Sequence, residues 1–494
     1  GRYFIAPRPG YWRVNASEVE FLECPNPNAC LGAQPGNDSH WPSGRCDYEG
    51  GYEGPLCTSC RRGFASAPRD TCLKCPPLGV TIVRVIATSS IVILFVVLVV
   101  RTSLKNAYSV EGKRSYLNVY LRIFASYTQL VSLTATLQLK WPSNFKELFF
   151  VQDQFGSISE QVISLDCFLG DEDSIRVTFV SILLINLIPI FLVLISTLFW
   201  GIFALLQPMA RKNLKTKMTS TVVIMLFLVH PSIMKQNFTF FSCRDLGDGH
   251  LHLVPDLSVR CWEGDHLKWT LSVVLPGTVL WVLGAPIAAV YTLFKEKRYL
   301  DRPSTKARFG FLYSGFKPNL FFWEFFTFLR KLSITCFVVF LGSAVEPPIQ
   351  VLLCFALMGI SYYLQQGFLP YVEAPLNSLE TRSIIVATIT IYCGLFFVRD
   401  KLDEGSEIFL FLLLISANLY FICYWIWKVS DKLPHIIEKK CPRFYEKLRD
   451  LRGKPKQQEY SVVESQGTAR ARELNPARFP VSKYRKTKGQ TLIQ

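Results

Sequence analysis

Long apolar stretches, separated by short polar segments, occupy most of the chain between residues 80 and 427. About 20 consecutive apolar residues are enough for a helix to cross the hydrocarbon core of a bilayer. The pattern therefore predicts about nine spanning helices, at 80–100, 118–138, 177–206, 217–234, 269–294, 323–342, 348–365, 381–398 and 406–427. The expected fold is an all-α polytopic membrane protein, whose termini lie on opposite sides because the number of spans is odd.

The distribution of charge predicts the orientation of these spans. The chain of 494 residues has a formal net charge of +16, and half of its residues are hydrophobic. Lys and Arg gather after the first, third, fifth and ninth predicted spans, whereas the loops at 160–173 and 400–407 are acidic. Short basic loops stay in the cytoplasm, so the N-terminus is predicted outside the cell and the C-terminus inside. This distribution also favours membrane topology over nucleic-acid binding, because it forms no soluble basic patch.

Residues 1–78 precede the first span and are rich in Gly, Pro and Cys. A segment of this size buries too little apolar surface to fold alone, and disulfides commonly replace the missing core. The module and the predicted outer loops supply an even set of disulfide candidates: Cys24, Cys30, Cys46, Cys57, Cys60, Cys72, Cys75, Cys167, Cys243 and Cys261. Seven of these lie in the module, so at least one should bond outside it, to Cys167, Cys243 or Cys261. Spacing alone leaves the pairing open.

Two Cys-x-x-Cys pairs in the module, Cys57/Cys60 and Cys72/Cys75, also have the spacing of a zinc ribbon. An oxidising extracellular compartment favours disulfides over zinc, so no metal and no other cofactor is expected. The sequons on the predicted outer side give three candidate glycosylation sites, Asn15, Asn37 and Asn237.

The predicted second span, 118–138, contains the polar residues Arg122 and Gln129. Such side chains are costly in contact with lipid, so this helix should be enclosed by other helices or line water. Further charged residues lie near the predicted inner ends of later spans: Glu324, Arg330, Lys331 and Glu380. In one interpretation these side chains snorkel to the membrane surface. In the other, Glu324 pairs with Arg330, Lys331 or Arg122 inside the bundle and marks an ion path or a gate.

Motifs in both parts of the chain carry a resemblance to a known family. In the module they are Cys46–Cys60, with Gly51-Tyr52-Glu53-Gly54-Pro55-Leu56, and Cys72–Pro76. In the membrane region they are Leu121–Leu130, Trp141-Pro142, Ser164–Cys167, Phe241–Cys243, Phe309–Pro318, Trp323-Glu324, Leu329–Lys331, Gln366–Tyr371 and Leu376–Glu380. The chain thus resembles large protist surface proteins that have an EGF-like, laminin-type module and a C-terminal multi-span domain labelled transient-receptor-potential-like. The resemblance implies a glycoprotein of the plasma or ciliary membrane, with cation-channel-like activity and Cys-rich repeats upstream of Gly1.

The chain departs from true channels of that name in its last outer loops. Those channels place a pore helix and filter between the last two spans, whereas Leu341–Pro348 and Arg399–Glu407 are too short to hold them. Two functions therefore remain open: a cation-channel-like subunit, or a non-conducting membrane anchor or assembly protein for an extracellular structure. The first predicts a homo-oligomer around a pore, and the second predicts an extracellular protein partner.

The C-terminal residues 431–494 form a basic tail, predicted to be helical at its start and then disordered. The Lys and Arg residues between 428 and 452 suit anionic lipid of the inner leaflet. The sequence has no phosphate-binding loop, catalytic metal motif or nucleophile elbow, so no enzymatic activity is expected. The predicted organisation is an extracellular module at 1–78, a transmembrane domain at 79–430 and a cytoplasmic tail at 431–494.

Overall fold

A computed structural model describes residues 6–13, 20–33, 44–67, 71–107, 116–135, 167, 174–207, 213–341, 347–397 and 403–440. The chain divides into two compact units, Gly1–Pro434 and His435–Gln494. In the second unit, the described residues are 435–440, the end of a helix. The predicted glycosylation sites Asn15 and Asn37 lie outside the described residues.

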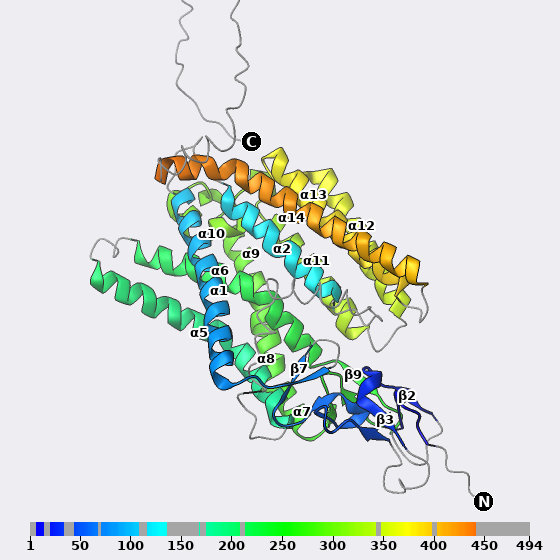
Figure 1. Cartoon of the computed structure of the whole chain (residues 1–494). Coiled ribbons are helices and arrows are strands. Elements are labelled where there is room, and N and C mark those ends of the chain that lie inside the picture. Colours follow the sequence, from blue (N-terminus) through cyan, green and yellow to red (C-terminus); the bar gives the residue numbers. More distant parts are fainter. Residues whose placement is uncertain are drawn as a thin grey trace, which may run out of the picture. The chain divides into compact units, whose positions relative to one another are not determined.

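Helices make up most of the first unit (Figure 1). In chain order they are α1 (Leu78–Ala107), α2 (Leu117–Ala135), α5 (Ser174–Leu206), α6 (Leu214–Thr239), α7 (Gly264–Trp269), α8 (Leu275–Gly277), α9 (Ala285–Lys295), α10 (Pro303–Tyr313), α11 (Trp323–Phe340), α12 (Pro347–Phe368), α13 (Ala374–Phe396) and α14 (Glu404–Lys440). Two π-helical segments, Thr270–Val274 and Thr278–Gly284, join α7, α8 and α9 into one continuous helix.

Among the described residues, six helices are long and apolar enough to cross a membrane, which indicates a membrane location. They are Val177–Leu206, Leu214–Thr239, Gly264–Lys295, Pro348–Phe368, Ala374–Phe396 and Gly405–Ser430. The predicted nine spans are not confirmed. The stretches at 80–100, 118–138 and 323–342 do form α1, α2 and α11, but these helices are not among the six. In α11 the apolar run is interrupted by Glu324, Arg330 and Lys331.

Prolines lie inside three of the spanning helices without ending them. The fourth predicted span ended at residue 234, but α6 contains Pro231 and continues to Thr239. Pro286, at the start of α9, cannot donate the usual helical hydrogen bond to the Val282 carbonyl. That carbonyl instead accepts a hydrogen bond from His230 Nε2, at 3.0 Å. A membrane helix tolerates proline when a neighbouring side chain satisfies the freed backbone group in this way.

Two helices approach each other closely at Gly277. A Cβ atom there would lie 1.9 Å from Asn186 Oδ1 of α5, so a side chain would displace Asn186 from its hydrogen bonds with Asn237. At Gly284, by contrast, the nearest atom to a Cβ would be the Val279 carbonyl oxygen of the same helix, at 2.8 Å.

The N-terminal module consists of short antiparallel strand pairs. The strands are β1 (Tyr11–Trp12), β2 (Leu22–Glu23), β3 (Cys30–Gly32), β4 (Arg45–Cys46), β5 (Tyr52–Glu53), β6 (Ser59–Cys60), β7 (Phe64–Ala67) and β8 (Thr71–Lys74). They pair as β1-β2, β3-β4, β5-β6 and β7-β8. Three disulfides lie within the module: Cys24–Cys30, Cys46–Cys57 and Cys60–Cys72. These cross-links hold together a segment that has few buried apolar residues of its own.

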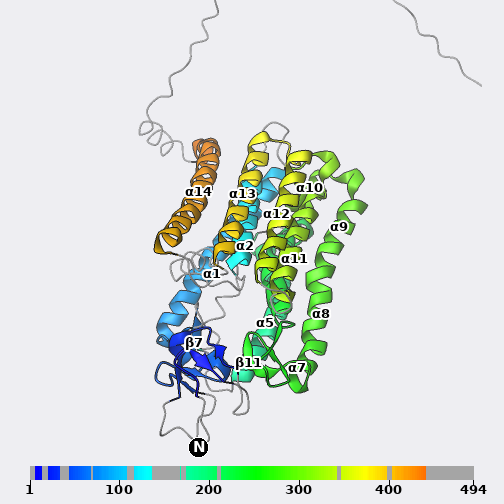
Figure 2. The ribbon, with the colours of Figure 1, turned by 90° about the vertical axis from the view of Figure 1, so that its right-hand side faces the viewer.

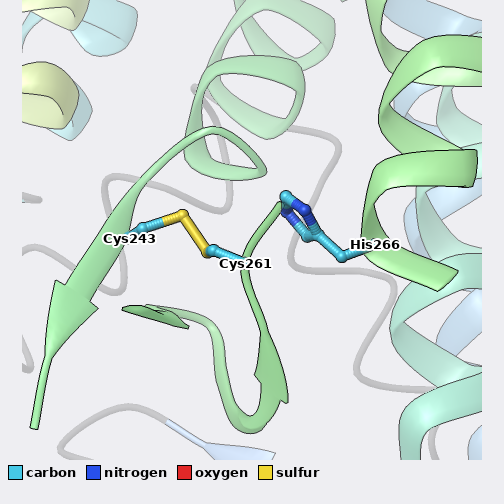
Figure 3. A group of neighbouring side chains, drawn as sticks. All are labelled: Cys243, Cys261 and His266. Atoms are coloured by element: carbon cyan, nitrogen blue, oxygen red, sulfur yellow. A yellow bond between two sulfur atoms is a disulfide. The ribbon is translucent and has the colours of Figure 1, made fainter. Parts of the chain in front are cut away.

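A second small sheet lies between α6 and α7. Its strands, β9 (Cys243–Asp245), β10 (Leu251–Leu253) and β11 (Asp256–Arg260), are antiparallel in the order β11-β10-β9. The disulfide Cys243–Cys261 connects the first strand to the residue that follows the last one (Figure 3). Figures 1 and 2 both show this sheet beside the strands of the module, at the end of the helices where α7 begins.

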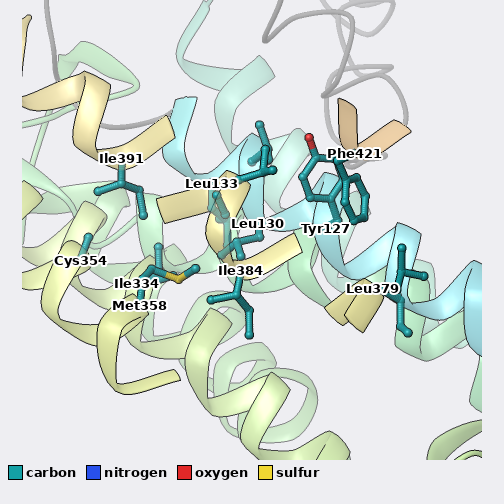
Figure 4. Packing of buried hydrophobic residues seen from close by; sticks show 14 of the residues in the cluster. Tyr127, Leu130, Leu133, Ile334, Cys354, Met358, Leu379, Ile384, Ile391 and Phe421 are labelled. Atoms are coloured by element: carbon teal, nitrogen blue, oxygen red, sulfur yellow. The ribbon is translucent and has the colours of Figure 1, made fainter. Parts of the chain in front are cut away.

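The largest apolar core joins α2, α11, α12, α13 and α14. Tyr127, Leu130 and Leu133 of α2 lie in its centre, against Ile384 of α13 and Phe421 of α14 (Figure 4). A second core lies among α5, α6 and the β10–β11 strands, and a third among α1, α6, α9 and α10. Helix α2 is thus enclosed by other helices, as its polar residues predicted.

Candidate functional site

A network of buried charges connects α2, α11 and α13. The Nε atom of Arg122 on α2 lies 3.2 Å from Glu324 Oε2 of α11, an ion pair without hydrogen-bond alignment. The guanidinium also donates to the carbonyl oxygens of Phe311 and Ser314, the latter at 3.2 Å. Its carbon Cζ lies 4.7 Å from the centre of the Phe316 ring. Because the side chain is only 2% exposed, these contacts replace the water that it would otherwise bind.

The second pair joins Arg330 of α11 to Glu380 of α13. Arg330 Nη2 donates to Glu380 Oε1 at 3.0 Å, and the side chains are 8% and 5% exposed. A buried pair of this kind is not by itself strongly stabilising, but loss of either partner leaves an uncompensated charge in the core. The pair therefore fixes the packing of α11 against α13.

Lys331, the neighbour of Arg330, has a different environment. Its ammonium group donates to Gln129 Oε1 at 2.7 Å and to Ser126 Oγ at 3.1 Å, both on α2. It also lies 5.3 Å from the centre of the Phe227 ring of α6. In the described part of this network, both carboxylates pair with arginines. Lys331 instead donates to the neutral oxygens of Ser126 and Gln129.

The structure thus brings together the six polar residues that the sequence marked: Arg122, Gln129, Glu324, Arg330, Lys331 and Glu380. Snorkelling to the membrane surface does not describe them, because each charged side chain is at most 12% exposed. Of the three partners considered for Glu324, the structure selects Arg122. The role of the network as an ion path or gate remains a prediction.

Two further polar contacts attach α14 to α2, and their residues were not predicted from the sequence. Asn418 of α14 accepts a hydrogen bond from the Tyr127 hydroxyl of α2, and Trp425 Nε1 donates to the Tyr120 carbonyl at 3.0 Å. Asn418 could have been found as a lone amide within a long apolar stretch, because such residues usually seek a partner in another helix.

The junction between the module and the helices is the second notable site. The disulfide Cys75–Cys167 connects the last cysteine of the module to a residue that precedes α5, across a sequence separation of 92. Leu246 and Leu257, from the sheet between α6 and α7, pack into the same apolar cluster as Cys24, Leu56 and Cys57 of the module. The module is therefore attached through a covalent bond and through a buried apolar contact.

The β9–β11 sheet is itself tied to the helices. Thr178 Oγ1 of α5 donates to Asp256 Oδ2 of β11 at 3.1 Å. His266 accepts a hydrogen bond from the Trp262 amide at Nδ1, so its Nε2 carries the hydrogen and donates to the Phe240 carbonyl at 3.1 Å. These bonds place the sheet between the module and the ends of α5, α6 and α7.

The structure pairs all ten disulfide candidates, as the even number of cysteines predicted. The odd module cysteine is Cys75, and it bonds to Cys167. Within each Cys-x-x-Cys pair the two sulfurs have different partners, which excludes the zinc-ribbon alternative. Cys243, Cys261 and His266 have the spacing of metal ligands (Figure 3), but the disulfide leaves neither sulfur as a thiolate.

The proposed glycosylation site Asn237 does not fit the folded protein. Its side chain is fully buried in α6, where its Nδ2 donates to the Ile233 carbonyl at 2.9 Å and to Asn186 Oδ1 at 3.1 Å. A glycan is attached to this same nitrogen and needs open space around it. The sequon Asn237-Phe238-Thr239 is therefore a helix-packing position.

Comparison with known proteins gives one informative similarity. The chain is 22% identical to "Cysteine repeat modular protein A" of Toxoplasma gondii over an alignment of 493 positions, which covers 84% of this chain. The match covers only 15% of that relative, so this chain corresponds to a small part of it. No protein-family model and no solved structure matches the chain. A Cys-rich relative is thus established, whereas an EGF-like or channel domain is not.

Proposed function

We propose that this chain is a membrane anchor that holds a Cys-rich extracellular region and transmits tension from it to the membrane helices. The observation that carries the proposal is the double attachment of the module, through Cys75–Cys167 and through the contact of Leu246 and Leu257 with the module core. A flexible linker would suffice for a module that only binds a ligand. A fixed junction is what a tensioned attachment requires.

The relative supports the same interpretation. The matched protein is named for cysteine repeats, and 85% of its length lies outside the match, by subtraction of the 15% that is covered. We infer that an extracellular Cys-rich assembly is held in the same way here, with the N-terminal module outside the cell. Its natural load is then an extracellular protein, and the basic tail faces the inner leaflet.

A second candidate, a cation-channel-like subunit, is favoured by the burial of five ionisable side chains among α2, α11 and α13. Ionisable residues inside a membrane commonly mark ion pathways. The short connections between the last helices argue against a conventional selectivity filter. Residues 341–346 separate α11 from α12, and residues 397–403 separate α13 from α14. These connections leave no room for a pore helix.

The two candidates predict different outcomes in one experiment on the full chain. The protein is extracted in mild detergent, its mass and symmetry are measured by native mass spectrometry, and the same sample is reconstituted into liposomes for a cation-flux assay. The anchor predicts no closed symmetric ring and a flux equal to that of empty liposomes. A ring-shaped homo-oligomer whose flux changes in an Arg330→Met/Glu380→Met variant would make the channel the better account.

A further inference from the structure

A cavity of about 350 Å³ lies among α6, α9, α10 and α11, beside the charge network. Fifteen of its nineteen lining residues are apolar, and the exceptions are His230, Thr292, Glu324 and Lys331. Small-molecule sites have this character, with mostly apolar walls and a few polar groups that fix orientation, in volumes of about 300–1,000 Å³. The cavity therefore has the size and lining of a ligand site.

The charge network beside the cavity, of which Glu324 and Lys331 line the wall, has an excess of positive charge. The network contains three cations, Arg122, Arg330 and Lys331, and two carboxylates, Glu324 and Glu380. The five formal charges therefore sum to +1. Each carboxylate oxygen lies beside an arginine nitrogen, at 3.2 Å for Glu324 and 3.0 Å for Glu380, which leaves the charge of Lys331 as the excess. Lys331 lies on the cavity wall and is 5% exposed. A buried cation without a carboxylate of its own is costly, and an anion in the cavity would compensate it.

The ammonium group of Lys331 is able to bind such an anion. It has three N–H donors, of which Ser126 and Gln129 take two. The remaining side of the group is near Phe227, which also lines the cavity. A hydrated inorganic anion would lose its water against apolar walls, so an anion with an apolar body fits better.

The position of Lys331 selects a compact head group. Lys331 follows Trp323, the first residue of α11, by eight positions, which corresponds to about 12 Å along the helix axis. A phospholipid would have to fit its phosphate and two acyl chains into the cavity of about 350 Å³. The carboxylate of a single-chain fatty acid meets the constraint, with its chain along the apolar wall that Ala285 and Ala289 of α9 form.

We propose that this cavity binds a long-chain fatty acid, with the carboxylate at Lys331 and the acyl chain between α6 and α9. The inference does not depend on the anchor function. The bound fatty acid would complete the packing between α6 and α9, and its carboxylate would neutralise the excess charge of the network at Lys331.

The test uses the full chain in detergent and a tritiated palmitate with a diazirine at the end of its chain. After photolysis, labelled peptides should map to α6 and α9, and unlabelled palmitate should compete whereas methyl palmitate should not. In Lys331→Met, labelling of these peptides should fall at least about tenfold, as expected when a charge-assisted hydrogen bond is lost. Ala289→Phe fills the cavity and should abolish labelling.

The matched control is Ile287→Phe, which adds bulk to the same helix at a position that is 59% exposed and does not line the cavity. Its labelling should equal that of the unmodified chain. Equal competition by palmitate and methyl palmitate would overturn the assignment of the carboxylate to Lys331, and this comparison needs no variant. Competition by phosphatidylglycerol at the same concentration would assign the cavity to a phospholipid chain instead. Unchanged labelling in a folded Lys331→Met or Ala289→Phe protein would contradict the site itself.

Discussion

Replacing both Cys75 and Cys167 by serine should lower the free energy of unfolding by about 4–5 kcal/mol, the loss expected for a loop of about 100 residues. The disulfide joins positions separated by 92 residues, so it restricts the unfolded chain more than any other disulfide of the described residues. Both cysteines are replaced together, because a single substitution would leave a free thiol that can exchange with the remaining disulfides. The measurement is denaturant unfolding of the purified chain in detergent under non-reducing conditions.

The matched comparison is the double variant Cys60→Ser/Cys72→Ser, which opens a loop with a sequence separation of 12. Its loss should be smaller, about 3 kcal/mol. It lies within the module, so it should leave the attachment to the helices intact. If both double variants lose the same free energy, the long-range bond has no special part in holding the module to the helices.

Arg330→Met should cost about 3–5 kcal/mol, because it leaves the Glu380 carboxylate buried without its cation. The two side chains are 3.0 Å apart and almost inaccessible to solvent. The double variant Arg330→Met/Glu380→Met removes both charges and should recover most of the loss. Thermal or denaturant unfolding of the single and double variants completes the double-mutant cycle.

The control for this cycle is Arg382→Met, two residues beyond Glu380 on α13. Arg382 is half-buried, with its guanidinium carbon 4.4 Å from the centre of the Tyr424 ring, and it donates to Ser378 at 3.3 Å. Its loss should cost about 1 kcal/mol or less. If Arg330→Met costs no more than Arg382→Met, the Arg330–Glu380 pair is solvated and the buried network is not as described.

The sequence predicted the environment of the polar residues better than their partners. Arg122 and Gln129 in an apolar stretch had to be enclosed, and α2 is enclosed. The partner of Glu324 could not be chosen from the sequence, because Arg122 is about 200 positions away and its approach depends on how α2 packs against α11. The partner of Arg330 could not be chosen from the sequence either, because its approach to Glu380 depends on how α11 packs against α13.

Cysteine parity was equally informative and equally incomplete. Seven module cysteines required an external partner, but the choice of Cys167 over Cys243 and Cys261 depends on the position of the β9–β11 sheet. One local signal was misleading. The sequon at Asn237 suggested a glycan, but α6 passes through this residue, and its amide is satisfied by Asn186 of α5 and by the Ile233 carbonyl.

We propose that tension on the N-terminal module reaches the membrane helices through the disulfide Cys75–Cys167. Single-molecule pulling on the N-terminus of the bilayer-embedded chain tests it directly, with the unmodified protein compared with Cys75→Ser/Cys167→Ser. In the unmodified protein, the disulfide closes a 92-residue loop that contains α1 and α2, so these helices cannot extend as free chain. The variant should therefore release about 300 Å of additional chain length. Equal lengths in the two proteins would contradict it.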